Sequence, residues 1–347
     1  MSALHPLSVE KIQRLTPSSV AISFTLPTSL AADFAFKAGQ YLSIEAQIDG
    51  TAVRRSYSLS AAPHENQLTV GIKKIEGGVF SSFANDQLAE GDVLQVAVPE
   101  GRFVYVPNNA TKQLLLVAAG SGITPIYSIL KTSLEKSEET TINLVYGNKS
   151  PQETLFYNEL IELQQRFSSR FKIHWVYSQS NEPDALFGRI DASFLKYALN
   201  QAKNTPDAVY LCGPEAMIKT AQSTLIDTGI EKENIHFELF TASESTTDAN
   251  EKSNGAVSLS ITVDDENHKI DTAANKTLLD AALQQKIEVP YSCQGGVCCS
   301  CIAKVTDGSA KMENNQILTD DEIEEGLVLT CQAFPTSASV SIDYDDV

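Results

Sequence analysis

The sequence predicts a multidomain protein in which an antiparallel β-barrel, an α/β domain with a parallel sheet and a small α+β domain follow one another. Three observations support this prediction. Short β-type runs separated by glycines fill residues 1–108, strands and helices alternate over residues 109–240, and residues 257–347 mix strands with a helix. A chain of 347 residues is also too long for one hydrophobic core.

The first domain is predicted from its turn signals. Glycines recur between short runs that are rich in β-branched and aromatic residues, a spacing typical of an antiparallel barrel. The expected strands are Val20–Leu26, Tyr41–Ile48, Arg55–Leu59, Leu68–Lys73 and Val93–Val98.

The second domain is predicted from the alternation of buried strands with helices. This order indicates a parallel sheet with right-handed crossovers. The expected strands are Leu114–Ala118, Thr141–Tyr146, Phe171–Tyr177, Ala208–Leu211 and Ile235–Leu239. The expected helices are Thr124–Leu134, Pro151–Phe167, Asp191–Leu199 and Pro214–Thr224.

Residues 241–256 contain no large apolar side chain, so their composition predicts a flexible linker. The last domain follows it. Its expected strands are Val257–Val263, His268–Asp271 and Ile302–Val305, with a helix at Thr277–Lys286.

The net charge of −18 argues against nucleic acid or an anionic membrane as a partner. Residues 257–347 hold 16 acidic residues and 5 lysines, so −11 of the charge lies in the last domain. This acidity favours either general solubility or electrostatic steering toward a basic patch on a partner. No apolar run reaches the roughly 20 residues that span a bilayer. The N-terminus lacks a signal-peptide pattern, so we expect a cytoplasmic protein without membrane insertion.

Four cysteines of the last domain have the spacing of a metal-cluster site. Cys293, Cys298 and Cys301 form a C-x4-C-x2-C pattern, and Cys331 follows later in the chain. This is the ligand spacing of a plant-type [2Fe–2S] ferredoxin. Disulfides are disfavoured without a secretory signal, and zinc favours two short cysteine pairs. Cys299 lies between the ligands and is expected not to bind the cluster.

Two glycine-led turns are candidate phosphate sites, because helix N-termini favour anions. Gly120 and Gly122 stand between the strand at Leu114–Ala118 and a helix, although Pro125 departs from the dinucleotide fingerprint. Gly77–Gly78 opens another helix about 20 residues after Arg55–Ser58. An arginine for pyrophosphate, an aromatic ring for stacking and this helix terminus together suggest a flavin site.

The order of these motifs resembles the ferredoxin–NADP reductase family. The motifs are Arg-x-Tyr-Ser, Gly-Gly-x-x-Ser, Gly-x-Gly-x-x-Pro and, at 212–214, Cys-Gly-Pro. With a β-grasp ferredoxin domain at the C-terminus, the chain is similar to the reductase components of multicomponent oxygenases. The segments Met312–Asn315 and Val328–Ala333 are similar to the C-terminal pattern of the subgroup that serves phenylacetyl-CoA epoxidase. The resemblance covers essentially the whole chain.

The resemblance implies domains at 1–108 (FAD), 109–240 (NAD(P)) and 257–347 ([2Fe–2S]), and it implies site residues. The residues that it assigns to FAD are Arg55, Ser56, Tyr57, Ser58, Gly78, Val79, Ser81 and Phe240. Those that it assigns to the nicotinamide nucleotide are Gly120, Gly122, Thr124, Cys212 and Gly213. It places Cys212, Thr124 and Glu238 at the reacting groups, and Cys293, Cys298, Cys301 and Cys331 on the iron. Phe240 and Cys212 could also be core residues.

The sequence does not define whether the electron donor is NADH or NADPH. The family often recognises the 2′-phosphate of NADPH with a Ser-Arg pair, and here the matching residues are Ser178–Gln179. The donor is therefore NADPH or NADH, with Lys149 and Arg189 as other possible phosphate partners.

The resulting hypothesis is an NAD(P)H-dependent flavin iron–sulfur oxidoreductase that feeds an oxygenase, with phenylacetyl-CoA epoxidase as the first expectation. Within the enzyme class, the alternative acceptors are a Rieske oxygenase, a desaturase or a cytochrome. From another class, the alternative is a redox sensor or ferredoxin-like carrier with a degenerate reductase half. The intact motifs at Arg55–Ser58 and Gly120–Gly122 favour the enzyme.

Overall fold

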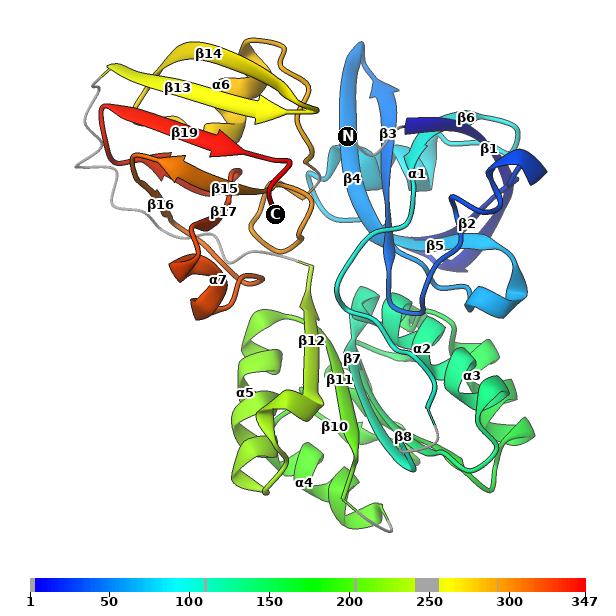
Figure 1. The fold of residues 1–347 in the computed structure, drawn as a ribbon. Coiled ribbons are helices and arrows are strands. Elements are labelled where there is room, and N and C mark those ends of the chain that lie inside the picture. The colour runs from blue at the N-terminus through cyan, green and yellow to red at the C-terminus, as the bar shows by residue number, and fades with distance from the viewer. Residues whose placement is uncertain (1–3, 109–110, 203–204, 241–255, 292) are drawn as a thin grey trace. The chain divides into compact units, whose positions relative to one another are not determined.

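The computed structural model describes residues 4–108, 111–202, 205–240, 256–291 and 293–347, which form two compact units (Figure 1). One unit comprises residues 4–240, and the other contains residues 256–347. The predicted linker 241–256 lies outside the described residues except for Ala256, which begins a strand. Each unit is described by itself.

The first half of the larger unit is an antiparallel barrel, as predicted. Its sheet order is β4-β3-β6-β1-β2-β5, and a bridge between Leu59 and Val70 joins the two end strands. Leu42 and Ile44 on one strand and Val70 and Ile72 on another are fully buried in the barrel core. The elements are β1 (Leu4–Thr16), β2 (Ser19–Phe24), η1 (Thr28–Leu30), β3 (Tyr41–Ile48), β4 (Thr51–Ser58), η2 (Pro63–Glu65), β5 (Leu68–Lys73), α1 (Val79–Asp86) and β6 (Val93–Ala97).

Strand β1 was not expected from the sequence. Its residues are mostly polar, and only Leu7, Val9 and Thr16 of its thirteen residues are buried. Pro6 lies inside it, although proline is unfavourable in a strand because it cannot donate to the ladder. Pairing with β2 and β6 nevertheless holds these residues in the sheet.

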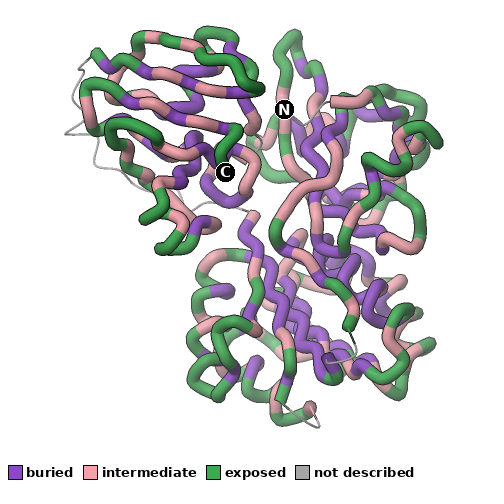
Figure 2. Tube along the Cα trace, in the orientation of Figure 1, coloured by how far each residue is buried: buried purple, intermediate pink, exposed green. Residues whose placement is uncertain are grey.

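The second half of the larger unit is a parallel sheet of order β10-β9-β8-β7-β11-β12. Helices α2 and α3 lie on one side of it and α4 and α5 on the other (Figure 1), so its central strands are buried (Figure 2). The elements are β7 (Gln113–Ala119), η3 (Gly120–Gly122), α2 (Ile123–Lys136), β8 (Thr141–Asn148), η4 (Pro151–Glu153), α3 (Tyr157–Arg166), β9 (Phe171–Tyr177), β10 (Leu186–Phe187), α4 (Ala192–Gln201), β11 (Ala208–Gly213), α5 (Glu215–Asp227), η5 (Lys232–Asn234) and β12 (Ile235–Leu239).

The prediction of one continuous helix over Pro151–Phe167 was wrong. A 3-10 turn at Pro151–Glu153 is separated from α3 by Phe156, which has a left-handed backbone (φ 57°). That conformation is costly for a bulky residue. It lets the Phe156 ring stack on Tyr127 of α2, with ring centroids 4.6 Å apart. Tertiary packing therefore overrides the helical pattern at this point.

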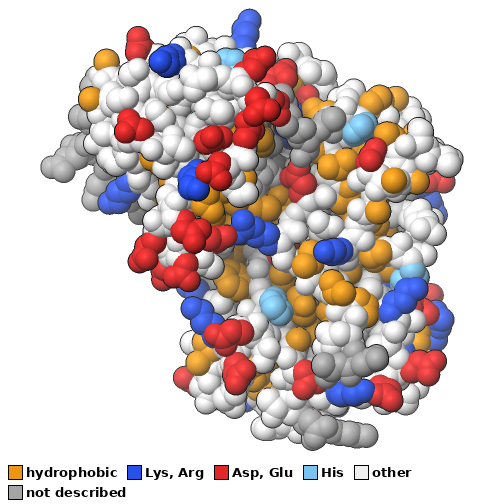
Figure 3. Space-filling model, in the orientation of Figure 1, with side chains coloured by type: hydrophobic (Ala, Val, Ile, Leu, Met, Phe, Trp, Pro, Cys, Tyr) orange, Lys and Arg blue, Asp and Glu red, His pale blue; other side chains and the backbone are white. Residues whose placement is uncertain are grey.

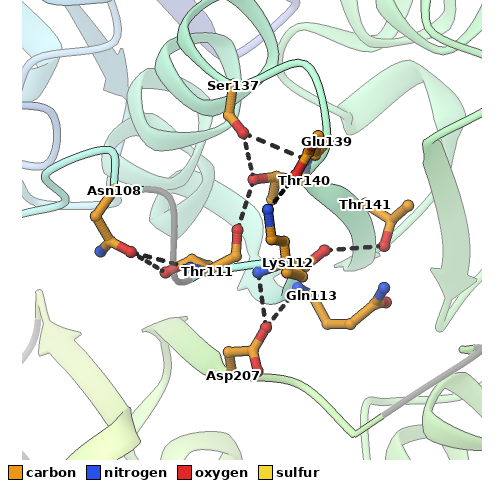
Figure 4. A network of polar contacts seen from close by, with 9 residues as sticks. All are labelled: Asn108, Thr111, Lys112, Gln113, Ser137, Glu139, Thr140, Thr141 and Asp207. Atoms are coloured by element: carbon orange, nitrogen blue, oxygen red, sulfur yellow. Dashed lines mark hydrogen bonds and ion pairs between the residues drawn. The ribbon is translucent and has the colours of Figure 1, made fainter.

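A polar network fixes the amino ends of the parallel strands (Figure 4). Asp207 Oδ2 accepts hydrogen bonds from the backbone N–H groups of Lys112 (2.7 Å) and Gln113 (2.8 Å). Thr140 Oγ1 donates to the carbonyl of Thr111 (2.8 Å), and Lys112 pairs with Glu139. Side-chain hydrogen bonds therefore occupy the amino edge of the sheet. At the carboxyl edge, glycine turns follow β7 and β11 instead.

The smaller unit is a mixed sheet of order β14-β13-β19-β15-β17, in which β13 and β19 run parallel, as predicted for a β-grasp domain. Helix α6 packs on it through Leu278, Leu279 and Ala282. The elements are β13 (Ala256–Val263), β14 (Glu266–Ala273), α6 (Leu278–Gln284), β15 (Ile302–Asp307), β16 (Ala310–Met312), α7 (Asp320–Glu324), β17 (Leu327–Leu329), β18 (Ala333–Pro335) and β19 (Ser339–Asp343).

Candidate functional site

The end of β4 carries the predicted flavin residues. Arg55 is exposed, Ser56 and Tyr57 are half-buried, and Ser58 is buried. The Tyr57 ring lies 5.4 Å from the ring of Phe80, the second residue of α1. Burial raises the pKa of Tyr57, so its hydroxyl stays neutral and its ring is suited to stacking.

The turn that opens α1 lies beside this strand. Gly77 has a left-handed backbone (φ 73°), and Gly78 is the N-cap of the helix. Ser81 is buried, accepts a hydrogen bond from the Ile75 N–H (3.1 Å) and donates to the Gly78 carbonyl. Ser81 therefore shapes the turn, while Val79 is half exposed beside it. An exposed helix N-terminus on the helix that contacts β4, the strand of Arg55, fits the phosphate groups of FAD.

The parallel sheet changes direction between β7 and β11, because the chain continues to β8 on one side and later returns to β11 on the other. Ligands of such sheets bind outside the carboxyl ends of the strands at this point. Gly120 and Gly122 follow β7 there, and Gly213 ends β11. A side chain at Gly122 would lie 2.3 Å from the Cys212 carbonyl oxygen, so only glycine lets the two turns meet.

The nucleotide turn is also held by a side chain that the sequence did not single out. Tyr146 Oη, at the end of β8, donates to the Gly120 carbonyl (3.1 Å). Thr124, in the first turn of α2, is buried, and its Oγ1 donates to the Ser121 carbonyl (3.1 Å). The fold thus presents a rigid turn whose Gly120 faces open space, as a dinucleotide site needs.

Three predicted residues from the two halves of the larger unit meet at one place. Ser58 Oγ donates to Glu238 Oε2 at 3.1 Å, and Glu238 lies opposite Cys212 in the β11–β12 pairing. Burial raises the pKa of Glu238 to about 8, although the Ser58 hydrogen bond lowers it. Burial and the nearby Glu238 raise the pKa of the Cys212 thiol. Burial therefore favours the neutral form of both groups. Phe240 packs against the core of the nucleotide domain.

The four predicted iron ligands form two pairs. The Cys293 and Cys298 thiols are hydrogen-bonded to each other, as are those of Cys301 and Cys331. The hydrogen bond from Cys298, and then N–H groups of the loop, lower the pKa of Cys293 to about 6. Two thiolate pairs suit a cluster of two irons.

The loop that carries three of these cysteines is fastened to two other segments. Asn314 Nδ2 donates to the Gly295 carbonyl (3.0 Å), and Gln332 Nε2 donates to the Gln294 carbonyl (3.1 Å). Gly296 has φ 72°, and a Cβ there would lie 2.9 Å from the Asn314 carbonyl oxygen. The segments singled out around Met312–Asn315 and Val328–Ala333 therefore act by holding the cysteine loop.

A second set of bonds fixes the fourth cysteine. The carbonyl of Cys301 accepts hydrogen bonds from both the N–H (3.0 Å) and the hydroxyl (2.9 Å) of Thr330. Tyr344 Oη in turn donates to Thr330 Oγ1 (2.8 Å). Cys331 follows Thr330 directly, so this chain of bonds sets the position of Cys301 relative to Cys331.

Three family models match consecutive parts of the chain. Residues 6–105 match the oxidoreductase FAD-binding domain, residues 116–223 match the oxidoreductase NAD-binding domain, and residues 261–336 match the 2Fe-2S iron-sulfur cluster binding domain. These ranges fall within the domains predicted from the sequence, whose boundaries stay a prediction.

Several relatives align with nearly the whole length of the chain. The chain is 35% identical over 358 residues to a subunit of 1,2-phenylacetyl-CoA epoxidase from Escherichia coli K12, covering 99% of each chain. It is 32% identical to the ferredoxin reductase component of 3-ketosteroid-9-alpha-monooxygenase from Rhodococcus rhodochrous, covering 97% of this chain and 96% of the relative. The solved structure of phthalate dioxygenase reductase is similar at 25% identity, with a TM-score of 0.64 and 98% of both chains covered.

Proposed function

Because the chain belongs to the ferredoxin–NADP reductase family, in the group that carries a [2Fe–2S] domain on the same polypeptide, we propose that it supplies electrons to a phenylacetyl-CoA epoxidase. The chain is an NAD(P)H-dependent flavin iron–sulfur oxidoreductase that uses FAD, a nicotinamide nucleotide and a [2Fe–2S] cluster. The observation that supports this acceptor is 35% identity, over 99% of each chain, with a subunit of such an epoxidase.

Bound FAD would supply the capacity to accept a hydride from the nicotinamide and to release its two electrons singly, and the cluster would supply single-electron transfer to the acceptor. We assign residue roles to this chemistry. Arg55 and the N-terminus of α1 hold the FAD phosphates, and the ring of Tyr57 stacks on the flavin. Gly120–Gly122 and Gly213 hold the nicotinamide nucleotide at the sheet edge.

Ser58, Cys212 and Glu238 surround the place where the two bound rings would meet. The Ser58 hydroxyl is fixed by its bond to Glu238, so its position relative to β11 and β12 is set across the two domains. Burial raises the pKa of both Glu238 and Cys212 and so favours the uncharged form of each. These residues therefore orient the rings and exclude water without placing a buried charge beside them.

The proposal is tested by reconstitution. Purified protein is mixed with the oxygenase component of phenylacetyl-CoA epoxidase, phenylacetyl-CoA and either NADH or NADPH, and the epoxide is quantified. We expect product formation that depends on this chain and is lost in Cys331→Ser. Reduction of cytochrome c without any epoxide would redirect the proposal to another acceptor. No nucleotide-dependent reduction of cytochrome c or ferricyanide would contradict the reductase role itself.

A further inference from the structure

The outer face of β5 is where the barrel meets the nucleotide domain. Side chains of a strand alternate between its two faces, and Val70 and Ile72 point into the barrel core. The outward-facing Lys73 has its Nζ 4.0 Å from Glu153 Oε2 of the nucleotide domain. Gly71 lies on this same outward face, next to the glycine turn after β7.

Gly71 packs closely against the nucleotide domain. A Cβ at this position would lie 2.7 Å from Cγ2 of Thr124 and 3.5 Å from Cζ of Phe156. Carbon atoms that are not bonded prefer about 3.5–4.0 Å, so the contact with Thr124 would not fit. The backbone of Gly71 has no left-handed φ, so the chain needs glycine here for space and not for conformation.

The neighbours of Gly71 cannot easily yield. Thr124 is 1% exposed, and its rotamer is fixed both by branching at Cβ and by the bond from Oγ1 to the Ser121 carbonyl. Phe156 is held by its stacking on Tyr127. An added methyl group would therefore push the two domains apart instead of being absorbed locally.

A glycine inside a strand weakens that strand, because it has no side chain to pack and loses more conformational freedom on folding. Alanine would be the better β5 residue if space were available. The position of Gly71 also connects two sites: Thr124 lies in the first turn of α2 after the nucleotide turn, and β5 runs on to the Gly77–Gly78 turn.

We propose that Gly71 is a positioning residue that sets the spacing between the flavin barrel and the nucleotide-binding turn. This inference rests on the proposed reductase chemistry and adds a determinant of its geometry. Hydride transfer needs two rings from different domains in contact, and a misplacement of about 1 Å can cost roughly a hundredfold in rate. Gly71 keeps the domains close enough for that contact.

The test is Gly71→Ala in the full chain with bound FAD. We expect the rate of flavin bleaching at saturating NADH, measured by stopped flow, to fall at least about tenfold. The affinity for NAD⁺ should change by less than about threefold, because the nucleotide turn itself stays intact. This NAD⁺ affinity is measured by titration followed by the fluorescence of Trp175, the one tryptophan of the sequence. Reoxidation of the reduced protein by ferricyanide should be unchanged.

A second variant identifies the contact responsible. Thr124→Ser keeps the hydroxyl that bonds Ser121 but removes the Cγ2 atom that a methyl group at position 71 would meet. The double variant Gly71→Ala/Thr124→Ser should bleach faster than Gly71→Ala alone. If Gly71→Ala fails to fold or loses FAD, recovery of folded, FAD-loaded protein in the double variant supports the proposal.

Two results would overturn this inference. One is a bleaching rate in Gly71→Ala equal to that of the wild type. The other is slow bleaching, misfolding or loss of FAD in Gly71→Ala that adding Thr124→Ser does not relieve. Either result leaves the reductase function intact, provided that the wild type is bleached by NADH or NADPH. A wild type that neither nucleotide bleaches would instead contradict the proposed function.

Discussion

Glu238 combines deep burial with a hydrogen bond from Ser58, and burial dominates its ionisation. Its pKa in the folded protein is about 8, compared with an ordinary value of 4.5. The folded state therefore holds a proton that the unfolded chain releases between these two values. Protonated Glu238 therefore contributes to the free energy of unfolding. This contribution is fully present below about pH 4.5, declines as the pH rises and is lost once the pH has passed about 8.

This difference gives a pH prediction. Between pH 5 and 8 the stability of the wild type should fall relative to Glu238→Gln, by at most about 1.4 kcal/mol per pH unit. The measurement is urea unfolding of both proteins followed by Trp175 fluorescence, which reports on the unit of residues 4–240. If the free energies of unfolding of the two proteins changed in parallel with pH over this range, Glu238 would be ionised in the folded state.

Gln179 is the residue at which donor choice should be decided. It is exposed just beyond β9, and its N–H donates to the Lys149 carbonyl (2.9 Å). We expect Gln179→Arg to raise kcat/KM for NADPH by about tenfold, because a guanidinium binds phosphate bidentately. Gln179→Lys is the matched control and should give a smaller gain. Equal kcat/KM values for NADPH in wild type and Gln179→Arg would place 2′-phosphate recognition elsewhere.

At the level of elements, the cysteine loop and the turn after β17 form one unit. The loop supplies Cys293, Cys298 and Cys301, while the bonds of Thr330 hold the Cys301 backbone next to Cys331. Cys299 lies within the loop but is half-buried against the hydrophobic core.

We expect Cys331→Ser to abolish the visible absorption of the cluster and to lower bound iron from about two atoms per chain toward none. Cys299→Ser is the control and should keep both the iron and the absorption. Flavin content should be unchanged in both variants, because the barrel is a separate structure. Loss of the cluster in Cys299→Ser would contradict the ligand assignment.

Comparing predicted with observed helices and strands shows where local sequence patterns were insufficient to predict them. Strands β3, β5, β9 and β12 have the bounds that the sequence predicted, since each carries a clear apolar run. The helix predicted over Pro151–Phe167 fails because Phe156 turns its ring onto Tyr127, a partner that is remote in sequence. Strand β1 escaped prediction because its neighbours, and not its own hydrophobicity, hold it in the barrel.

At the level of the whole molecule, the charge is unevenly distributed. Residues 257–347 carry a net −11 and no arginine. Carboxylates gather at α7, whose residues include Asp320, Asp321, Glu322 and Glu324 (Figure 3). Within the described part of the chain, no helix is long and apolar enough to cross a membrane. A cytoplasmic location stays a prediction.

This charge distribution predicts opposite salt effects with two acceptors. Electron delivery to a basic protein such as cytochrome c should slow as salt rises from about 50 to about 500 mM, because screening removes the attraction. Reduction of the anion ferricyanide should not slow under the same conditions. Steady-state rates at saturating NADH measure both. A cytochrome c rate that is independent of salt would contradict steering by the acidic domain.

The sequence by itself determined the three domain types and the cofactor set, and it predicted candidate site residues, because those depend on local patterns: cysteine spacing, glycine turns before helices and apolar periodicity. Only the tertiary structure brought Ser58 to Glu238 across 180 residues and Gly71 against Thr124. These contacts come from packing between domains, which short-range patterns do not encode. The raised pKa of Glu238 has the same origin, because burial is a property of the folded molecule.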